Sequence, residues 1–154
     1  MTRLAKVPTI QLAKIDRALK ADADAHRLIT GTLMEFDGVR PRTRTECKSA
    51  GRCALGSLMF YAPSISVWSI VSAFPRPKQV AQLQRIYGLL ELHLDAIYET
   101  NDNTEDADNN GTRYEEVMAL VTFAEWAQQE GIRFRSGYAL REAYALGKFD
   151  DYNG

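Results

Sequence analysis

Apolar side chains recur at intervals of three and four residues along most of this 154-residue chain. Near its start, Leu12, Ile15 and Leu19 are separated by charged residues, which predicts an amphipathic helix capped by Thr9. The same spacing predicts helices in three later parts of the chain. They cover residues 80–87 with a stop near Gly88, residues 90–101, and residues 137–146.

The clearest helix is expected to begin at Thr112, where Thr112-x-x-Glu115 forms a capping box, and to end at Gly131. Its predicted core stripe, widened by Phe123 and Trp126, consists of Val117, Leu120, Val121, Ala124 and Ala127. The apolar face expected for the last helix consists of Tyr138, Leu140, Ala143, Tyr144 and Leu146. Both helices should therefore contribute to the core.

Residues 52–62 combine small and large apolar side chains and predict a central helix, which begins after Gly51 and ends at Pro63. Gly56 and Ser57 are small enough for a neighbouring segment to approach closely. The expected neighbour is the helix that ends at Asn101-Asp102, where the two side chains can bond free backbone groups.

Two segments depart from the helical pattern. Asp37-Gly38 is typical of a two-residue hairpin turn, so a short β-hairpin near residues 30–45 is an open alternative there. Residues 64–74 fit neither the helical nor the strand period, and we expect an irregular or short helical segment that covers the core.

The pattern as a whole predicts an all-α fold, a compact single domain of five or six helices. Hydrophobic residues make up 45% of the chain and charged residues 25%, as is typical of a folded globular protein. We expect one domain over residues 1–154, with flexible ends at residues 1–8 and 147–154.

Charge and composition bear on the class of partner. Nineteen Lys and Arg face twenty Asp and Glu, and this net charge of -1 predicts no overall field toward nucleic acid or an anionic membrane. The apolar runs are shorter than the roughly 20 residues that span a bilayer, and the N-terminus lacks the regions of a secretory signal. We therefore expect a cytoplasmic protein without a membrane partner.

Cys47 and Cys53 match neither a zinc site nor a redox motif, so we expect reduced thiols, with Cys53 buried.

Three short motifs carry a resemblance to other proteins. Residues 53–58 read Cys-Ala-Leu-Gly-Ser-Leu, residues 97–102 read Ile-Tyr-Glu-Thr-Asn-Asp, and Glu115-Glu116-Val117 follows. Over residues 50–127 the chain resembles small helical proteins of unknown function from bacteria and their phages, which have Ala where Ser57 stands here. The resemblance implies a helical fold and a mobile-element origin, without implying an activity.

The sharpest local motif for a metal is Asp106-x-Asp108-x-Asn110-Gly111, which matches the first half of an EF-hand calcium loop. The twelfth position of such a loop supplies a bidentate carboxylate, and here it is Val117. A solvated acidic loop before a helix accounts for the same residues. We therefore expect no high-affinity calcium site at Asp106, Asp108 and Asn110, and no cofactor.

The expected partner-binding residues are Arg40, Arg42 and Arg44 on an exposed arm, together with Trp68 and Phe74. Guanidinium groups on an arm can bond an acidic partner, and an exposed aromatic side chain can serve as an anchor in an interface. The alternative for Trp68 is burial in the core.

We expect a phage or mobile-element accessory protein that binds a host or phage protein, of the host-takeover or anti-defence type. The first alternative is nucleic-acid binding through the Arg40–Arg44 arm, although no aromatic residues lie among its arginines to stack on bases. The second is a cysteine-dependent hydrolase. It is disfavoured because His26 and His93 stand at no spacing known to activate Cys47 or Cys53, and we do not expect an enzyme.

Overall fold

Helices make up most of what the structure, a computed structural model, describes. It describes residues 8–29, 33–35, 43–66, 70, 75–103 and 110–147. The helices are α1 (Leu12–Asp24), α2 (Arg44–Cys47), α3 (Ala54–Phe60), α4 (Pro77–Tyr87), α5 (Glu91–Asp102), α6 (Asn110–Gln129) and α7 (Gly137–Leu146). Within these ranges there is no strand, only an isolated parallel bridge between Leu28 and Arg52. The all-α prediction is confirmed, with six longer helices and the four-residue α2 in the described residues.

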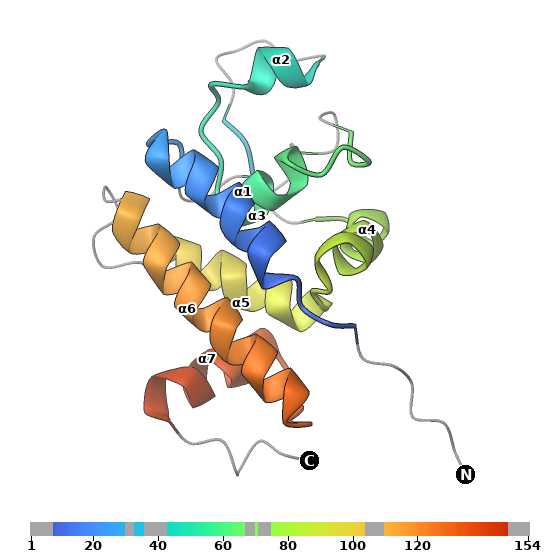
Figure 1. Ribbon diagram of the computed structural model, residues 1–154, viewed down its shortest axis with the longest axis vertical. Coiled ribbons are helices and arrows are strands. Elements are labelled where there is room, and N and C mark those ends of the chain that lie inside the picture. Colours follow the sequence, from blue (N-terminus) through green and yellow to red (C-terminus); the bar gives the residue numbers. More distant parts are fainter. Residues whose placement is uncertain are drawn as a thin grey trace.

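The helices α5 and α6 pack side by side, α6 also lies beside α1, and α7 packs against α5 and α6 (Figure 1). The first residue of α7, Gly137, lies against the first turns of α5. The short helix α3 contacts both α1 and α5, and α4 lies to the side against α1. No helix in the described ranges combines the length and the apolar content that crossing a membrane requires.

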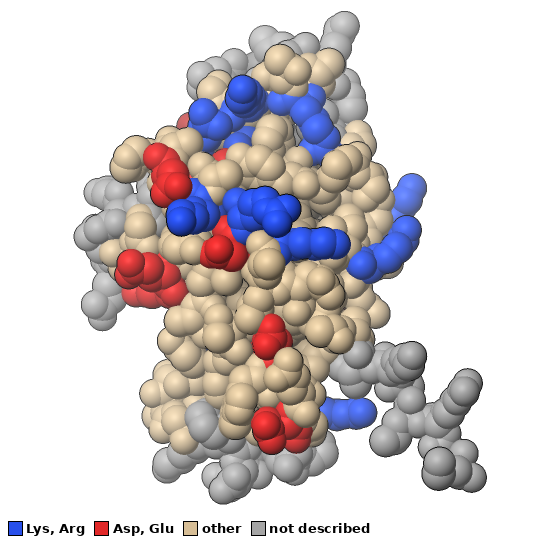
Figure 2. Space-filling view, viewed as in Figure 1, with Lys and Arg blue, Asp and Glu red and all other residues tan. Residues whose placement is uncertain are grey.

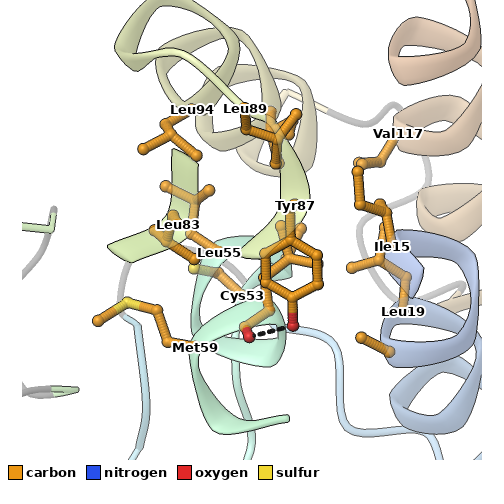
Figure 3. Close-up of a cluster of buried hydrophobic side chains, with 14 of the residues drawn as sticks. Ile15, Leu19, Cys53, Leu55, Met59, Leu83, Tyr87, Leu89, Leu94 and Val117 are labelled. Carbon is orange, nitrogen blue, oxygen red and sulfur yellow. Dashed lines mark hydrogen bonds between the residues drawn. The ribbon is translucent and has the colours of Figure 1, made fainter. Parts of the chain in front are cut away.

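One hydrophobic core joins these helices. Leu55 and Leu58 of α3 lie in the same cluster as Leu120 and Val121 of α6, as predicted. Figure 3 shows side chains from α1, α3, α4, α5 and α6 converging on this cluster. The ring of Tyr87 reaches into it from α4, and its hydroxyl donates a hydrogen bond of 2.6 Å to the carbonyl oxygen of Leu58. A buried hydroxyl is tolerated there because it has an acceptor.

The central helix is shorter than predicted, although its surroundings match the prediction. Cys53 lies outside it as the N-cap, and the helix ends at Phe60 rather than at Pro63. Gly56 is required by a close backbone approach, since a Cβ atom there would lie 1.7 Å from the carbonyl oxygen of Leu33. Ser57 donates a hydrogen bond of 3.1 Å to the carbonyl oxygen of Ala18 in α1. The two small residues thus admit two neighbours, as expected.

The predicted helix ends agree with the structure better than the predicted helix starts. Gly88 ends α4 with a φ of 73°, which only glycine adopts readily, and Gly131 follows α6 with a φ of 77°. Thr9 is not the cap of α1, because Gln11 holds that place and its N–H donates to the carbonyl oxygen of Tyr87. That bond fixes the chain to the end of α4 before α1 begins.

The capping box proposed for α6 is also wrong. The helix begins at Asn110, so Thr112 lies inside its first turn. The next residue, Arg113, is buried and donates hydrogen bonds to the carbonyl oxygens of Asn101 and Leu28. These long-range bonds hold the first turn of α6 against α5. A capping motif describes bonds between residues three apart in the sequence, so it could not predict them.

The β-hairpin alternative can be compared with the structure only in part, because the Asp37-Gly38 turn lies outside the described residues. The described residues of that range, 33–35 and 43–45, form no strand, and Arg44 begins α2. In the 64–74 segment, Ile65 and Ile70 are buried in the core, as a covering segment requires.

Candidate functional site

Only one of the predicted partner-binding residues can be located. Arg40, Arg42, Trp68 and Phe74 lie outside the described residues. Arg44 belongs to α2, and its guanidinium donates hydrogen bonds to the carbonyl oxygens of Phe60, Ala62 and Ile65. The prediction of an exposed arm is therefore wrong for Arg44, because its guanidinium binds carbonyl groups at the end of α3 and in the segment that follows it.

Of the three residues weighed as a metal site, only Asn110 belongs to the described residues. Asp106 and Asp108 lie outside the described ranges, and Asn110 is the first residue of α6. Among the residues that are described, no three His, Cys, Asp or Glu side chains are grouped so as to hold a metal ion. The absence of a high-affinity calcium site stays a prediction.

The cysteines lie in surroundings that suppress their reactivity. Cys47 and Cys53 are both buried and free of disulfides. The sulfur of Cys53 accepts a hydrogen bond of 3.4 Å from the backbone N–H of Gly56, at the start of α3. Burial raises the pKa of the Cys53 thiol to about 12, so it is neutral near pH 7. A neutral, inaccessible thiol is a poor nucleophile.

His93 is engaged within its own helix. Its Nδ1 atom accepts a hydrogen bond of 2.9 Å from the backbone N–H of Leu90, which the first turn of α5 would otherwise leave unsatisfied. Burial lowers the pKa of His93 to about 4. The ring is therefore neutral near pH 7 and has a structural task. His26 is exposed, in a left-handed conformation after α1.

A buried ion pair links α1 to the segment before α3. Arg52 and Asp22 are both inaccessible to solvent, and their side chains form two hydrogen bonds of 2.7 and 2.9 Å. Arg52 also donates to the carbonyl oxygen of Cys47, and its guanidinium carbon lies 3.8 Å from the centre of the Phe60 ring. The hydroxyl of Tyr61 donates to the same carboxylate. Both charged groups therefore have hydrogen-bond partners, and these bonds connect α1, the end of α2 and the segment before α3.

A second buried polar cluster joins α5, α3 and α6. The side-chain oxygen of Asn101 accepts from the backbone N–H of Ala54, and its amide nitrogen donates to the carbonyl oxygen of Ile29. The expectation that Asn101 bonds free backbone groups is confirmed, and the predicted neighbour of the central helix is the one observed. Both clusters bond backbone groups at helix ends or between helices, so we interpret them as structural rather than reactive.

The remaining candidate lies on the surface between α6 and α7. The ring of Phe123 lies 5.8 Å from that of Trp126, 6.1 Å from that of Phe134 and 5.6 Å from that of Tyr144, measured between ring centres. We call these four residues the aromatic surface. Trp126 is 41% exposed and Tyr144 43% exposed, so two large rings face solvent beside two that are partly covered.

The sequence pattern assigned several apolar side chains of α6 and α7 to buried faces, although the structure exposes them. Trp126 was expected to widen the core stripe of α6, but with 3.6 residues per turn it lies nearly half a turn from Ala124 and its buried neighbours. Tyr138 and Leu146 were expected in the apolar face of the last helix and are 73% and 57% exposed.

The small residues of α7 explain this result. Gly137 approaches α5 so closely that a Cβ atom would lie 2.7 Å from the carbonyl oxygen of Leu92. The covered side of α7 therefore runs through Gly137, Leu140 and Ala143, and the larger apolar residues fall outside it. The triplet spacing of these three residues in the sequence was the signal that could have shown which face is buried.

Comparison of the chain with protein-family models, with curated proteins and with solved structures finds no match.

Proposed function

We propose that the protein acts by binding another protein and that the aromatic surface of α6 and α7 makes the central contact. The observation that carries this proposal is the exposure of Trp126 and Tyr144 on one continuous cluster of rings. Trp and Tyr, with Arg, are the side chains that contribute most to protein interfaces. Their exposure is otherwise unfavourable, because apolar rings gain free energy by leaving water.

The surroundings of this surface suggest the chemistry of the partner. Arg133 and Arg135 are exposed in the segment that joins α6 to α7, next in the chain to the Phe134 ring. An interface with an aromatic centre and arginines at its rim fits a partner that offers an apolar pocket bordered by carboxylates. On the resemblance of residues 50–127 that the sequence motifs predict, we further propose that the protein is an accessory factor of a mobile element.

The binding test compares variants of the surface with a matched control. Partners are first captured from a bacterial lysate treated with nuclease, and the affinity of a purified partner is then measured by titration calorimetry. A Trp126→Ala, Tyr144→Ala variant should weaken binding at least about thirtyfold, since one hot-spot aromatic contributes about 2 kcal/mol or more. The control is Tyr138→Ala, which removes an even more exposed tyrosine of α7 from outside the aromatic surface.

The result against the proposal would be an unchanged affinity in the double variant, with its helical circular dichroism intact. Loss of every captured protein on nuclease treatment would also contradict it, because the contacts would then depend on nucleic acid.

A further inference from the structure

The near-zero net charge of the chain conceals a strong separation of charge along it. Residues 1–90 contain 14 Lys and Arg against 6 Asp and Glu, whereas residues 91–154 contain 5 against 14. Residues 47–90 contain no acidic residue at all. Residues 91–132 contain eleven acidic residues and a single basic one, Arg113, whose side chain is buried. The two halves therefore carry about equal and opposite charge.

The fold places this positive charge on one face. The exposed basic side chains belong mainly to α1, to α4 and to the residue after α2, and Figure 2 shows Lys and Arg gathered over this part of the molecule. We define the basic face by the exposed Lys and Arg side chains of α1 and α4 together with Lys48, which are Lys14, Arg17, Lys20, Lys48, Lys78 and Arg85. Two carboxylates of α1 lie near them: that of Asp16 accepts a hydrogen bond from the hydroxyl of Tyr114 and is half-buried, whereas that of Asp24, the last residue of the helix, is exposed.

We propose that the basic face binds the sugar–phosphate backbone of double-stranded nucleic acid. Lysine and arginine on a surface neutralise phosphates and release counterions, and this term needs no base-specific contact. The acidic residues of the C-terminal half would be repelled by the same phosphates, so the charge separation also orients the protein on the duplex. This site is separate from the aromatic surface and does not depend on the function proposed for it.

The composition of the basic face favours a phosphate backbone over an acidic protein. Four of its six residues are lysines, which are depleted in protein interfaces and bind phosphate as point charges. None of the large apolar side chains exposed in the described residues belongs to α1, α2 or α4. Tyr61, 38% exposed, lies beside α1 with its hydroxyl bonded to Asp22. A single ring gives unpaired bases little platform for stacking, which favours a duplex over a single strand.

The test measures the affinity of the full chain for a fluorescent 20-base-pair duplex by anisotropy, as a function of salt. Two variants remove two charges each, Lys14→Gln with Arg17→Gln on α1, and Lys78→Gln with Arg85→Gln on α4. The control, Arg133→Gln with Arg135→Gln, removes the same charge from exposed positions beside the aromatic surface. Because all six side chains are exposed, the variants should melt like the unmodified protein.

We expect each basic-face variant to reduce the slope of log affinity against log salt by about 2 and to weaken binding at 0.1 M salt at least about tenfold. The control should change the slope by less than about 0.5. Equal effects of all three variants would overturn the proposal, because binding would then follow net charge and not this face. Failure of the unmodified protein to bind the duplex at low salt would also overturn it, as would tighter binding to polyglutamate of the same length and charge.

Discussion

Around α1, α3 and the start of α6, arginine side chains bond backbone carbonyl groups, whereas the rest of α6 meets α5 and α7 through apolar side chains. Arg44, Arg52 and Arg113 together donate to six carbonyl oxygens, which belong to the last turns of helices or to the segments between helices. In the other region, Leu94, Ile97, Leu120 and Leu140 belong to the hydrophobic core. The difference follows from the backbone. A helix satisfies the carbonyl groups of its interior, while those of its last turn and of irregular buried segments need donors from elsewhere.

This difference separates two ways of using large side chains. In the arginine-bonded region the long polar side chains are bonded to the backbone of the protein itself, as Arg44 shows. In the helix-packed region small residues such as Gly137 and Ala143 make the close contacts, and large rings remain available on the surface. We therefore expect substitutions to change stability in the first region and binding at the aromatic surface of the second.

The largest effect should come from breaking the buried ion pair. Asp22→Asn should lower the free energy of unfolding by about 3 to 5 kcal/mol, because it leaves the charge of Arg52 buried without its counterion. Urea denaturation followed by circular dichroism measures this loss. An Asp22→Leu, Arg52→Met double variant should lose less than the single variant, and an equal or greater loss would mean that the charges themselves are not what the site requires.

The core shared by the two regions gives the next effect. Leu120→Ala should cost about 2 to 5 kcal/mol, since this side chain is buried in the cluster that also contains Leu55 and Leu58. The same denaturation experiment applies, with the exposed Thr122→Ala substitution of α6 as the control. A melting temperature unchanged by Leu120→Ala would contradict the placement of the core.

His93, at the start of α5, should make stability depend on pH. Its pKa is lowered to about 4 in the folded protein, against about 6.5 when it is exposed. Above pH 6.5 both states are neutral, and as the pH falls from 6.5 to 4 the unfolded chain binds a proton that the folded protein does not. Stability should therefore fall by about 3 kcal/mol over this range.

A matched variant isolates this contribution. His93→Gln removes the titration but can keep the hydrogen bond from the backbone of Leu90, as Gln79 does for Arg76 at the same position of α4. Denaturation curves at several pH values should show a shallower decline in the variant between pH 6.5 and 4. Parallel declines in both proteins would assign the pH dependence to other groups.

The smallest effect on stability should come from the aromatic surface. Trp126→Ala should cost only about 1 kcal/mol, the contribution of one ring contact, because the indole is 41% exposed. Thermal melting measures it. A loss as large as that of Leu120→Ala would show that Trp126 serves the core and would weaken the case for a binding surface.

The sequence by itself determined the helical class, the extents of α5 and α7, the stops at Gly88 and Gly131, and the shared core of the central helix and α6. These features depend on apolar periodicity and on glycine conformation, both of which are local. The tertiary structure decided that Asp22, Arg52 and Arg113 are buried, because their partners lie up to 85 residues away in the chain. It also decided which rings stay exposed, since the small residues of α7, and not its large ones, match the surface of α5.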